Sequence, residues 1–395
     1  MNKTPKLRFK EFSGDWESKK LGTICDVTMG QSPSSSCYNE RNIGLPLIQG
    51  NADVQGRKTA PRIYTSDITK TCNIGDIIMS VRAPVGAISK SIHDACIGRG
   101  VCSIKPKQSN EFIYQFLIKY EDKWSRISQG STFESVNRTD ITDTKVSIPS
   151  KEEQEKIASF FSLIDDKIYL QGEKVEALKD YKKGMMQKIF SRELRFKDDD
   201  GRDYPAWEEK KLGDLGKFYR GHSYNAGDVN EDGLLVLRSN NIQDNTITFD
   251  TDLQFVRKQC KDEIKLREKD IVICMANGSR NLVGKSGEFN NSNGYNDLTV
   301  GAFCSIYRTK NPLGKYLLQI ELYYKYLDIL LSGTNINNLK NSQLEELQFN
   351  IPTSNEETEK IVKILSDIDL KIKKEQEKLY YLNEYKKGLL QHMFV

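Results

Sequence analysis

The residue spacings that enzyme chemistry requires are nearly absent from this sequence. The segment from Gly278 to Ser286 resembles a phosphate-binding loop, but five residues separate its two glycines where the P-loop requires four. The Asn-Pro-Pro-aromatic or Asp-Pro-Pro-aromatic tetrapeptide of an adenine methyltransferase does not occur. The acidic pair Asp165-Asp166 lies in a heptad-patterned stretch, where we expect a solvated helix face. We therefore predict a chain that has no catalytic residues of its own.

Histidine and cysteine offer little for metal binding. The chain has three histidines, and we expect core or surface roles for His93 and His222, which have no partners in the sequence pattern. Eight cysteines are scattered without a Cys-x-x-Cys pair, which argues against a zinc cluster or a disulfide framework and fits a reducing cytosol. No signal peptide and no run of about 18 apolar residues is present. The expectation is a cytoplasmic protein without a metal site or membrane contact.

The composition permits a nucleic-acid partner without identifying one. A length of 395 residues suggests two or more domains, and 37% hydrophobic with 29% charged residues describes a globular protein. The formal net charge is only +4, whereas a strong electrostatic footprint for nucleic acid is a markedly basic domain. If the chain binds DNA, its basic side chains must gather on one face.

A duplication spans the whole chain and must position any functional residues. The tetrapeptide Tyr-Lys-Lys-Gly at residues 181–184 recurs at residues 385–388, which is 204 residues later. The opening Leu-Arg-Phe-Lys at residues 7–10 recurs at residues 194–197. The repeated units are therefore about 190–205 residues long. Loops between the matched segments differ, as expected for two related domains with different targets.

Each repeat begins with mixed strands and helices. Residues 77–81 are predicted to form a buried strand, and residues 101–104 form another, which residues 303–306 match in the second repeat. Aromatic residues recur every four positions from Phe112 to Trp124, which favours an amphipathic helix. We predict an α/β (α+β) fold with domains at residues 1–148 and 191–350, each followed by a long helix at residues 149–190 and 351–395.

The two long segments have the apolar spacing of a coiled coil. Their apolar residues step by four and three and skip polar residues at Gln171, Lys182, Glu375 and Lys386. We expect the two helices to pair antiparallel with pseudo-two-fold symmetry, because the end of the second repeat continues into the start of the first. The predicted seam consists of Ile157, Phe161, Ile164, Ile168, Val175, Leu178, Met185, Ile361, Leu365, Ile368, Ile372, Leu379, Leu382, Leu389 and Met393. The Tyr-Lys-Lys-Gly lysines either cap the helix ends or belong to a docking surface.

These features together resemble the specificity (S) subunit of type I restriction-modification systems, of the Hsd type. Each domain opens with a tryptophan and a Lys-Lys-Leu-Gly segment, at residues 16–22 and 207–213. Each closes with a Gly-Ser or Gly-Thr turn, at residues 130–131 and 333–334, followed by an Ile-Pro pair and an acidic helix start. The match covers the full length. The second helix departs by opening with Asn-Glu-Glu-Thr at residues 355–358, where the family usually has a Glu-Glu-Gln-like run.

The resemblance implies a non-catalytic reader of double-stranded DNA. Each target recognition domain would recognise one half of an asymmetric bipartite site, and the helices would set the spacer. They would also dock two modification subunits, which methylate adenine with S-adenosylmethionine, and the complex would include restriction subunits that use ATP and Mg²⁺. No cofactor is expected in this chain itself. The alternative is a scaffold whose end domains bind proteins, and a third hypothesis is a self-sufficient nuclease or methyltransferase.

DNA contact requires Arg or Lys for guanine, Asn or Gln for adenine, and donors for phosphates. The alternative for any one of these loop residues is an ordinary solvated surface. In the first domain the candidates are Gln31, Ser32, Gln49, Asn51, Arg57, Lys58, Arg62, Arg82, Arg99 and Arg138. In the second they are Arg220, Ser223, Tyr224, Arg238, Asn240, Asn241, Arg280, Asn281, Asn337 and Lys340.

Overall fold

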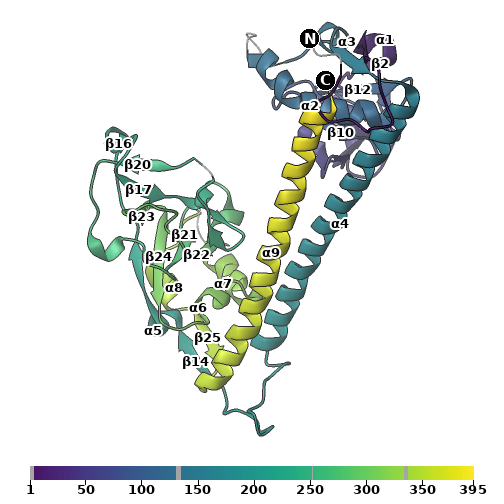
Figure 1. The fold of residues 1–395 in the computed structure, drawn as a ribbon. Helices are drawn as coiled ribbons and strands as arrows, with labels where there is room; N and C mark the ends of the chain where they lie inside the picture. The colour runs from purple at the N-terminus through teal and green to yellow at the C-terminus, as the bar shows by residue number, and fades with distance from the viewer. Residues whose placement is uncertain (1–3, 130–134, 251, 333–336) are drawn as a thin grey trace. The chain divides into compact units, whose positions relative to one another are not determined.

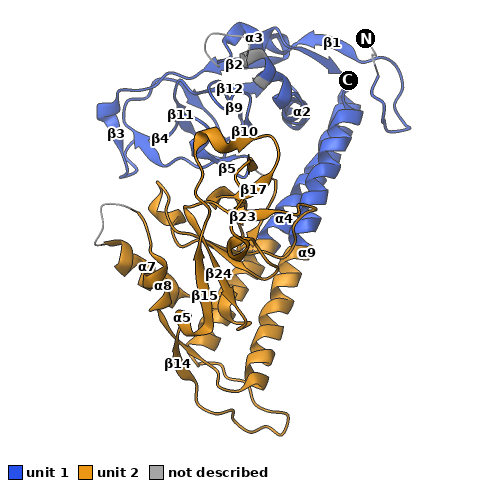
Figure 2. Ribbon diagram, turned by 90° about the vertical axis from the view of Figure 1, so that its left-hand side faces the viewer, with its two compact units in different colours: residues 1–174, 375–395 blue, residues 175–374 orange. Residues whose placement is uncertain are grey.

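The computed structural model describes residues 4–129, 135–250, 252–332 and 337–395, and the chain divides into two compact units. The first unit comprises residues 1–174 and 375–395, and the second comprises residues 175–374 (Figure 2). The division falls inside the two long helices, so each unit contains part of both. The predicted turns at residues 130–131 and 333–334 lie outside the described residues.

The first unit contains a six-stranded and a five-stranded sheet. The strand predicted at residues 77–81 is β9, which lies inside the larger sheet and is fully buried. In pairing order that sheet contains β2 (Cys25–Met29), β12 (Val101–Pro106), β9 (Ile77–Ser80), β10 (Ile88–Lys90), β6 (Lys58–Thr59) and β5 (Val54–Gln55). The smaller sheet contains β3 (Tyr38–Asn39), β7 (Ile63–Thr65), β4 (Leu45–Ile48), β11 (Ala95–Ile97) and β8 (Thr71–Cys72).

The second unit repeats this arrangement with different loops. Its larger sheet contains β15 (Gly216–Arg220), β24 (Cys304–Thr309), β21 (Ile271–Cys274), β22 (Ser286–Glu288), β19 (Thr246–Ile247) and β18 (Ile242–Gln243). Its smaller sheet contains β16 (Val229–Asn230), β20 (Gln254–Val256), β17 (Leu234–Leu237) and β23 (Leu298–Val300). The mixed strand and helix composition predicted for both domains is confirmed.

The strand that contains the two lysines of the Lys-Lys-Leu-Gly segment pairs with the last strand of the same domain. β1 (Glu17–Lys20) pairs antiparallel with β13 (Lys145–Ile148), and β14 (Glu208–Lys211) pairs in the same way with β25 (Gln348–Ile351). The strand that opens each domain is thereby joined to the strand that leads into the long helix. The shorter helices are α1 (Leu21–Ile24), α2 (Asn110–Gln129), α3 (Arg138–Thr142), α5 (Leu212–Leu215), α6 (Gly314–Leu317), α7 (Glu321–Ser332) and α8 (Asn341–Glu345).

The long helices are α4 (Lys151–Phe190) and α9 (Asn355–Met393), which are both drawn in Figure 1. In the first unit, Phe161 near the start of α4 shares a core with Leu389 near the end of α9. In the second unit, Ile189 at the end of α4 shares a core with Ile361 near the start of α9. The helices therefore pair antiparallel, as predicted. None of the described helices is long and apolar enough to cross a membrane.

The predicted seam residues are all buried or half-buried. Where polar residues interrupt the apolar spacing, at Gln171 and Glu375, the two helices make a polar contact. The Gln171 amide nitrogen donates to the Glu375 carboxylate at 2.8 Å and to the Glu375 carbonyl at 2.9 Å. These two residues occupy equivalent positions of the repeat. The Gln171 donor, with the Lys378 and Lys174 ammonium groups, holds the pKa of Glu375 at about 2.

At the other two polar interruptions of the seam, Lys182 and Lys386, each lysine pairs with an aspartate of the opposite helix. Lys386 donates to Asp165 at 2.6 Å in the first unit, and Lys182 donates to Asp369 at 2.7 Å in the second. The Gln115 amide of α2 also donates to Asp165, at 2.7 Å. The prediction of Asp165 as a solvated face is therefore wrong, because its charge is needed to neutralise a buried lysine. The first lysine of each Tyr-Lys-Lys-Gly repeat belongs to the helix seam.

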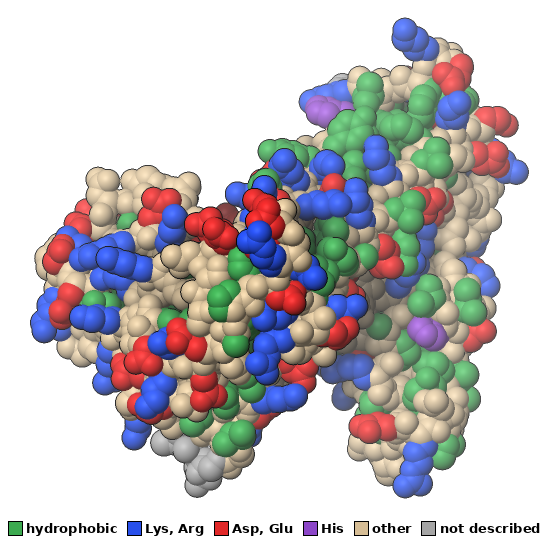
Figure 3. All heavy atoms as spheres, turned by 90° about the horizontal axis from the view of Figure 1, so that it is seen from below, with side chains coloured by type: hydrophobic (Ala, Val, Ile, Leu, Met, Phe, Trp, Pro, Cys, Tyr) green, Lys and Arg blue, Asp and Glu red, His purple; other side chains and the backbone are tan. Residues whose placement is uncertain are grey.

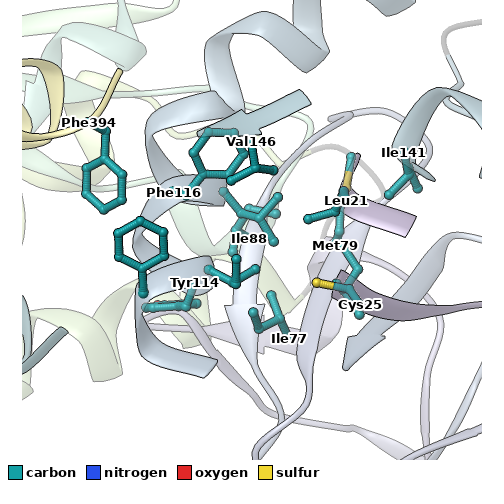
Figure 4. Packing of buried hydrophobic residues seen from close by; sticks show 14 of the residues in the cluster. Leu21, Cys25, Ile77, Met79, Ile88, Tyr114, Phe116, Ile141, Val146 and Phe394 are labelled. Atoms are coloured by element: carbon teal, nitrogen blue, oxygen red, sulfur yellow. The ribbon is translucent and has the colours of Figure 1, made fainter. Parts of the chain in front are cut away.

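The core of the first unit is an aromatic cluster around the C-terminal segment. Phe394 is 3% exposed, and its ring centroid lies 5.0 Å from that of Phe112 and 5.9 Å from that of Phe161. Figure 4 shows Phe394 entering the cluster of buried side chains that includes Phe116. The chain end is thus part of the core of the domain that begins the sequence.

Candidate nucleic-acid interface

Four loops meet in the first unit, and we call them the first loop cluster: residues 30–32, 49–51, 81–83 and 98–100. They directly follow β2, β4, β9 and β11. Backbone hydrogen bonds join them, since the Gln31 nitrogen donates to the Ile97 carbonyl at 2.9 Å and the Gly98 nitrogen donates to the Ile48 carbonyl at 2.8 Å. The Val81 nitrogen donates to the Gly100 carbonyl at 2.9 Å. Strand ends from both sheets are therefore held at one place.

Glycine makes this close approach of the backbones possible. A Cβ atom on Gly100 would lie 2.0 Å from the Gln49 carbonyl oxygen, and one on Gly30 would lie 2.1 Å from the Gly98 carbonyl oxygen. No side chain fits at either position, because real Cβ atoms essentially never come that close to backbone oxygen. These glycines bring the neighbouring polar side chains together.

Six of the predicted contact residues lie in the first loop cluster. The Arg99 guanidinium and backbone nitrogen both donate to the Ser32 hydroxyl, at 3.3 and 3.2 Å. The buried Asp53 carboxylate accepts from the Gln49 nitrogen at 2.8 Å and holds that loop. Arg82, in the loop after β9, is exposed beside them. The six are Gln31, Ser32, Gln49, Asn51, Arg82 and Arg99, and all of them are exposed or half-buried.

The second unit has a second loop cluster, formed by residues 221–223, 238–240, 275–277 and 301–303. They follow β15, β17, β21 and β23, the counterparts of the four strands above. The His222 nitrogen donates to the Val300 carbonyl at 2.7 Å, and the Gly301 nitrogen donates to the Leu237 carbonyl at 2.8 Å. The Met275 nitrogen donates to the Phe303 carbonyl at 2.8 Å. The same backbone hydrogen bonds therefore recur.

The predicted residues Ser223, Arg238 and Asn240 lie in the second loop cluster. Ser223 and Asn240 are exposed, while the Arg238 guanidinium donates to the Asp252 carboxylate at 2.8 Å. His222 is buried there, and its burial and the nearby Lys258 ammonium lower its pKa. Its ring nitrogen Nε2 has no hydrogen-bond partner among the described residues.

Equivalent positions of the two clusters have different side chains on loops that share these backbone hydrogen bonds, although the backbones differ locally at Gly100, where no Cβ fits, and Phe303. By their hydrogen bonds, Gln31 corresponds to His222, Gln49 to Arg238, and Gly100 to Phe303. Beyond these positions the first loop is one residue longer, so Asn51 begins the turn Asn51–Asp53, whereas Asn240 is the second residue of the equivalent turn Ser239–Asn241. Amide, hydroxyl and guanidinium groups are the groups that hydrogen-bond to base edges. Two such sites with different side chains can recognise two different sequences.

Other predicted contact residues of the first unit are engaged elsewhere. Arg57 makes a bidentate pair with Glu121 at 2.6 and 2.9 Å, and Arg62 donates to Asp53 at 2.9 Å. The Lys58 ammonium lies 4.8 Å from the centroid of the Tyr169 ring in α4. Arg138 is exposed at the start of α3. The geometry supports positioning roles for Arg57 and Arg62, because their charges are already paired.

In the second unit, the predicted contact residues outside the loop cluster are likewise either bonded to other parts of the unit or left at its surface. Asn241 is 1% exposed and accepts from the Arg238 nitrogen at 2.9 Å, so it shapes the loop from inside. Arg280 donates to the Asp328 carbonyl at 3.2 Å, and the Asn337 amide donates to the Gly278 carbonyl at 3.3 Å. Exposed or half-buried residues without such a role are Arg220, Tyr224, Asn281 and Lys340.

Sequence reasoning missed Phe303, which is 72% exposed in the second loop cluster. The shared Cys-Ser-Ile sequence aligned Phe303 with Val101, a buried strand residue. The hydrogen bonds shift this alignment by one residue and place Phe303 opposite Gly100, before β24 begins. The signal available in the sequence was a large aromatic residue directly beside a glycine-containing turn.

Charge is distributed without one dominant sign on the face shown in Figure 3, where basic side chains lie among acidic ones. This agrees with the small formal net charge of +4. Affinity for a phosphate backbone would then come from local groups such as Arg82, Arg99 and Arg220, which are exposed.

Comparison with known proteins identifies similar chains. The family model described as the type I restriction modification DNA specificity domain matches residues 13–180 and 205–383. A relative from Methanocaldococcus jannaschii, provisionally named the MjaX specificity subunit of a type I restriction enzyme, is 34% identical over 197 residues. That alignment covers 49% of this chain and 46% of the relative, so it spans about half of the relative's length.

Two further similarities cover nearly the whole chain. The MjaVIII type I restriction enzyme specificity subunit of the same organism is 23% identical over 409 residues, with 93% of this chain and 92% of the relative covered. The crystal structure of a type I restriction-modification S subunit from M. genitalium superposes with a TM-score of 0.55 at 16% identity. It covers 99% of both chains, and at this identity it shows a shared fold.

Proposed function

The chain belongs to the type I restriction-modification DNA specificity family, and on this premise we propose that it is the sequence-specificity subunit of a type I restriction-modification complex. Each loop cluster binds one half of a bipartite site on double-stranded DNA. The observation that carries the proposal is the recurrence of one loop backbone with different polar side chains in the two units. Because the side chains differ, the two half-sites differ, and the site is asymmetric.

The chain acts in this proposal as a recognition subunit without catalysis. Methylation of adenine with S-adenosylmethionine, and ATP- and Mg²⁺-dependent translocation and cleavage, belong to modification and restriction subunits that assemble with it. The lack of a P-loop and of a methyltransferase tetrapeptide in its sequence supports this division of labour. The long helices supply surface for the two modification subunits.

Mapping of methylated bases in the host, with and without this chain, tests the function. We expect an asymmetric bipartite methylated motif that disappears when the chain is deleted. A gel shift of the complex with its modification subunits separates this function from a protein-binding scaffold, for which no sequence-specific retention of DNA is expected. Methylation that is unchanged by the deletion would contradict the proposal.

Removing amide side chains from the first loop cluster should relax only one half of the motif. Each bidentate side-chain contact to a base is worth about 1–3 kcal/mol, so Gln49→Ala and Asn51→Ala should each weaken binding by about 5- to 150-fold. Competition gel shifts with duplexes altered in one half-site measure the effect. Asn240→Ala is the matched control and should relax the other half. Equal relaxation of both halves by Asn51→Ala would exclude the assignment of one cluster to one half-site.

We propose that the paired helices set the spacer between the half-sites. One heptad inserted after Gly172 and another after Gln376, which are equivalent positions of the repeat, preserves the antiparallel seam. Seven residues add about 10 Å to a helix, which matches about three base pairs at about 3.4 Å each. Methylome sequencing should therefore show a spacer that is longer by about three base pairs.

The control for this insertion is the same heptad placed in α4 alone. It shifts the seam on one helix, so that Lys182 and Lys386 cannot both remain paired with Asp369 and Asp165. We expect loss of stability and no defined new spacer from this variant. An unchanged spacer in the double insertion, with methylation intact, would refute the role of the helices in spacing.

A further inference from the structure

Phe303 lies in the second loop cluster and presents its phenyl ring to solvent. The ring is 72% exposed, although the backbone that carries it is firmly held. The Phe303 carbonyl accepts from the Met275 nitrogen at 2.8 Å and from the Ala276 nitrogen at 3.2 Å. The Cys304 nitrogen closes the turn on the Gly301 carbonyl at 2.8 Å. The exposure of the ring is therefore built into the fold.

The fold does not require an aromatic ring at this position. In the first unit Gly100 occupies the equivalent place, and its carbonyl accepts the equivalent hydrogen bond from the Val81 nitrogen at 2.9 Å. The same turn therefore forms without a side chain. A phenyl ring that does not pack against its own domain is left available for an apolar group of a partner.

The surroundings of Phe303 indicate the kind of group that it meets. The loop of residues 301–303 is hydrogen-bonded to the end of β17, which leads into the exposed Asn240. Val300 and Cys304, on either side of this loop, accept hydrogen bonds from the loop after β15, which contains the exposed Ser223. These polar side chains can hydrogen-bond to base edges. Among the groups that bases expose in the major groove, the C5-methyl of thymine is the apolar one, and phenylalanine is among the side chains that contact it.

We propose that Phe303 is a specificity-determining residue of the second unit, which selects a thymine in its half-site by contact with the C5-methyl group. This inference rests on the proposed DNA-binding function of the second loop cluster. The first unit has Gly100 at the same place and makes no such contact from this position. Burial of one methyl group is worth about 0.8 kcal/mol, which corresponds to about a four-fold preference.

The test uses the full chain in complex with its modification subunits and two randomised duplex libraries, one synthesised with thymine and one with uracil in its place. Wild-type protein should select a thymine at one position of one half-site. In the uracil library, its preference for the base at that position should be about four-fold weaker. Phe303→Ala should lose the same preference in the thymine library and show no further loss with uracil. Phe303→Leu, which keeps an apolar side chain, should retain part of it.

The outcomes separate this inference from the proposed function. If the wild type selects no sequence from either library, the proposed function fails and the inference fails with it. If the wild type selects a bipartite sequence but Phe303→Ala selects the same bases with the same preference, only the inference is overturned. A loss of equal size on thymine and uracil also overturns it, because the ring would then act without the methyl group.

Discussion

Replacement of Arg8 by methionine should lower the free energy of unfolding of the first unit by about 3 kcal/mol. The Arg8 guanidinium donates to both oxygens of Glu153, each at 2.7 Å, and the Glu153 side chain is only 1% exposed. Without Arg8, a buried carboxylate at the start of α4 has no opposing charge. A urea titration followed by hydrogen exchange, which resolves the two units, measures the loss.

The equivalent substitution in the second unit is a matched control with a smaller expected effect. Arg195 pairs with Glu357 in the same way, at 3.1 and 2.8 Å. In addition, the Trp207 indole nitrogen donates to Glu357 at 3.0 Å, whereas the indole nitrogen of Trp16 has no hydrogen-bond partner among the described residues. Arg195→Met should therefore cost about 1–2 kcal/mol. A larger loss in Arg195→Met than in Arg8→Met would contradict this account of the two pairs.

Truncation of Phe394 to alanine should destabilise the first unit by about 3–5 kcal/mol, the usual range for a buried phenylalanine. Its ring packs against Phe112 and Phe161 and also lies 6.4 Å from the ring of Trp16. The Phe394 carbonyl accepts from the Lys119 ammonium at 3.0 Å, so the chain end is held on both sides. Hydrogen exchange of α2 in the full chain, at increasing urea, reports the loss.

Phe190, the repeat counterpart of Phe394, provides the control for this truncation. It is half-buried, and its ring contacts Trp207 at a centroid distance of 6.2 Å. Phe190→Ala should therefore cost about 1–3 kcal/mol, and it should affect the second unit. Equal destabilisation by the two truncations would mean that Phe394, which follows α9, contributes no more to the core of the first unit than Phe190 does to that of the second.

The ion pairs in the structure explain the role of the two repeated sequence motifs. The arginine of each Leu-Arg-Phe-Lys segment neutralises the glutamate at the start of the helix that follows the domain. The first lysine of each Tyr-Lys-Lys-Gly segment pairs with an aspartate of the opposite helix. The arginine motif therefore joins each domain to the long helix that follows it, and the lysine motif joins the two long helices to each other. Because each domain is attached to its long helix, its loop cluster has a fixed position on that helix. The proposed role of the helices in setting the spacer requires such a fixed position.

Local periodicity explains why much of the fold was predictable. The 204-residue repeat, the heptad spacing and the polar steps at Gln171 and Glu375 can be read directly from the sequence. The antiparallel pairing followed from the continuity between the repeats. Asp165 was misjudged because its partner, Lys386, lies far away in the chain, and no local pattern announces such a pair.

The candidate site was predictable in its residue types and not in its geometry. Gln31, Gln49, Asn51 and Arg99 were recognised as polar loop residues, but so was Arg57, which the structure pairs with Glu121. Loop side chains follow no period, so sequence alone does not distinguish a residue aimed at a ligand from one paired internally. Phe303 was overlooked because an apolar residue next to a strand is most simply interpreted as part of the strand.

The sequence by itself therefore determined the duplication, the two mixed domains and the paired long helices, because these depend on repeated and periodic spacing along the chain. Only the tertiary structure decided which loops meet, which carboxylates neutralise Arg8 and Lys386, and where Phe303 points. Those features depend on hydrogen bonds and burial between segments that are distant in the chain. A shift of one residue, as between Gly100 and Phe303, leaves the strand pattern intact and changes which side chain occupies the site.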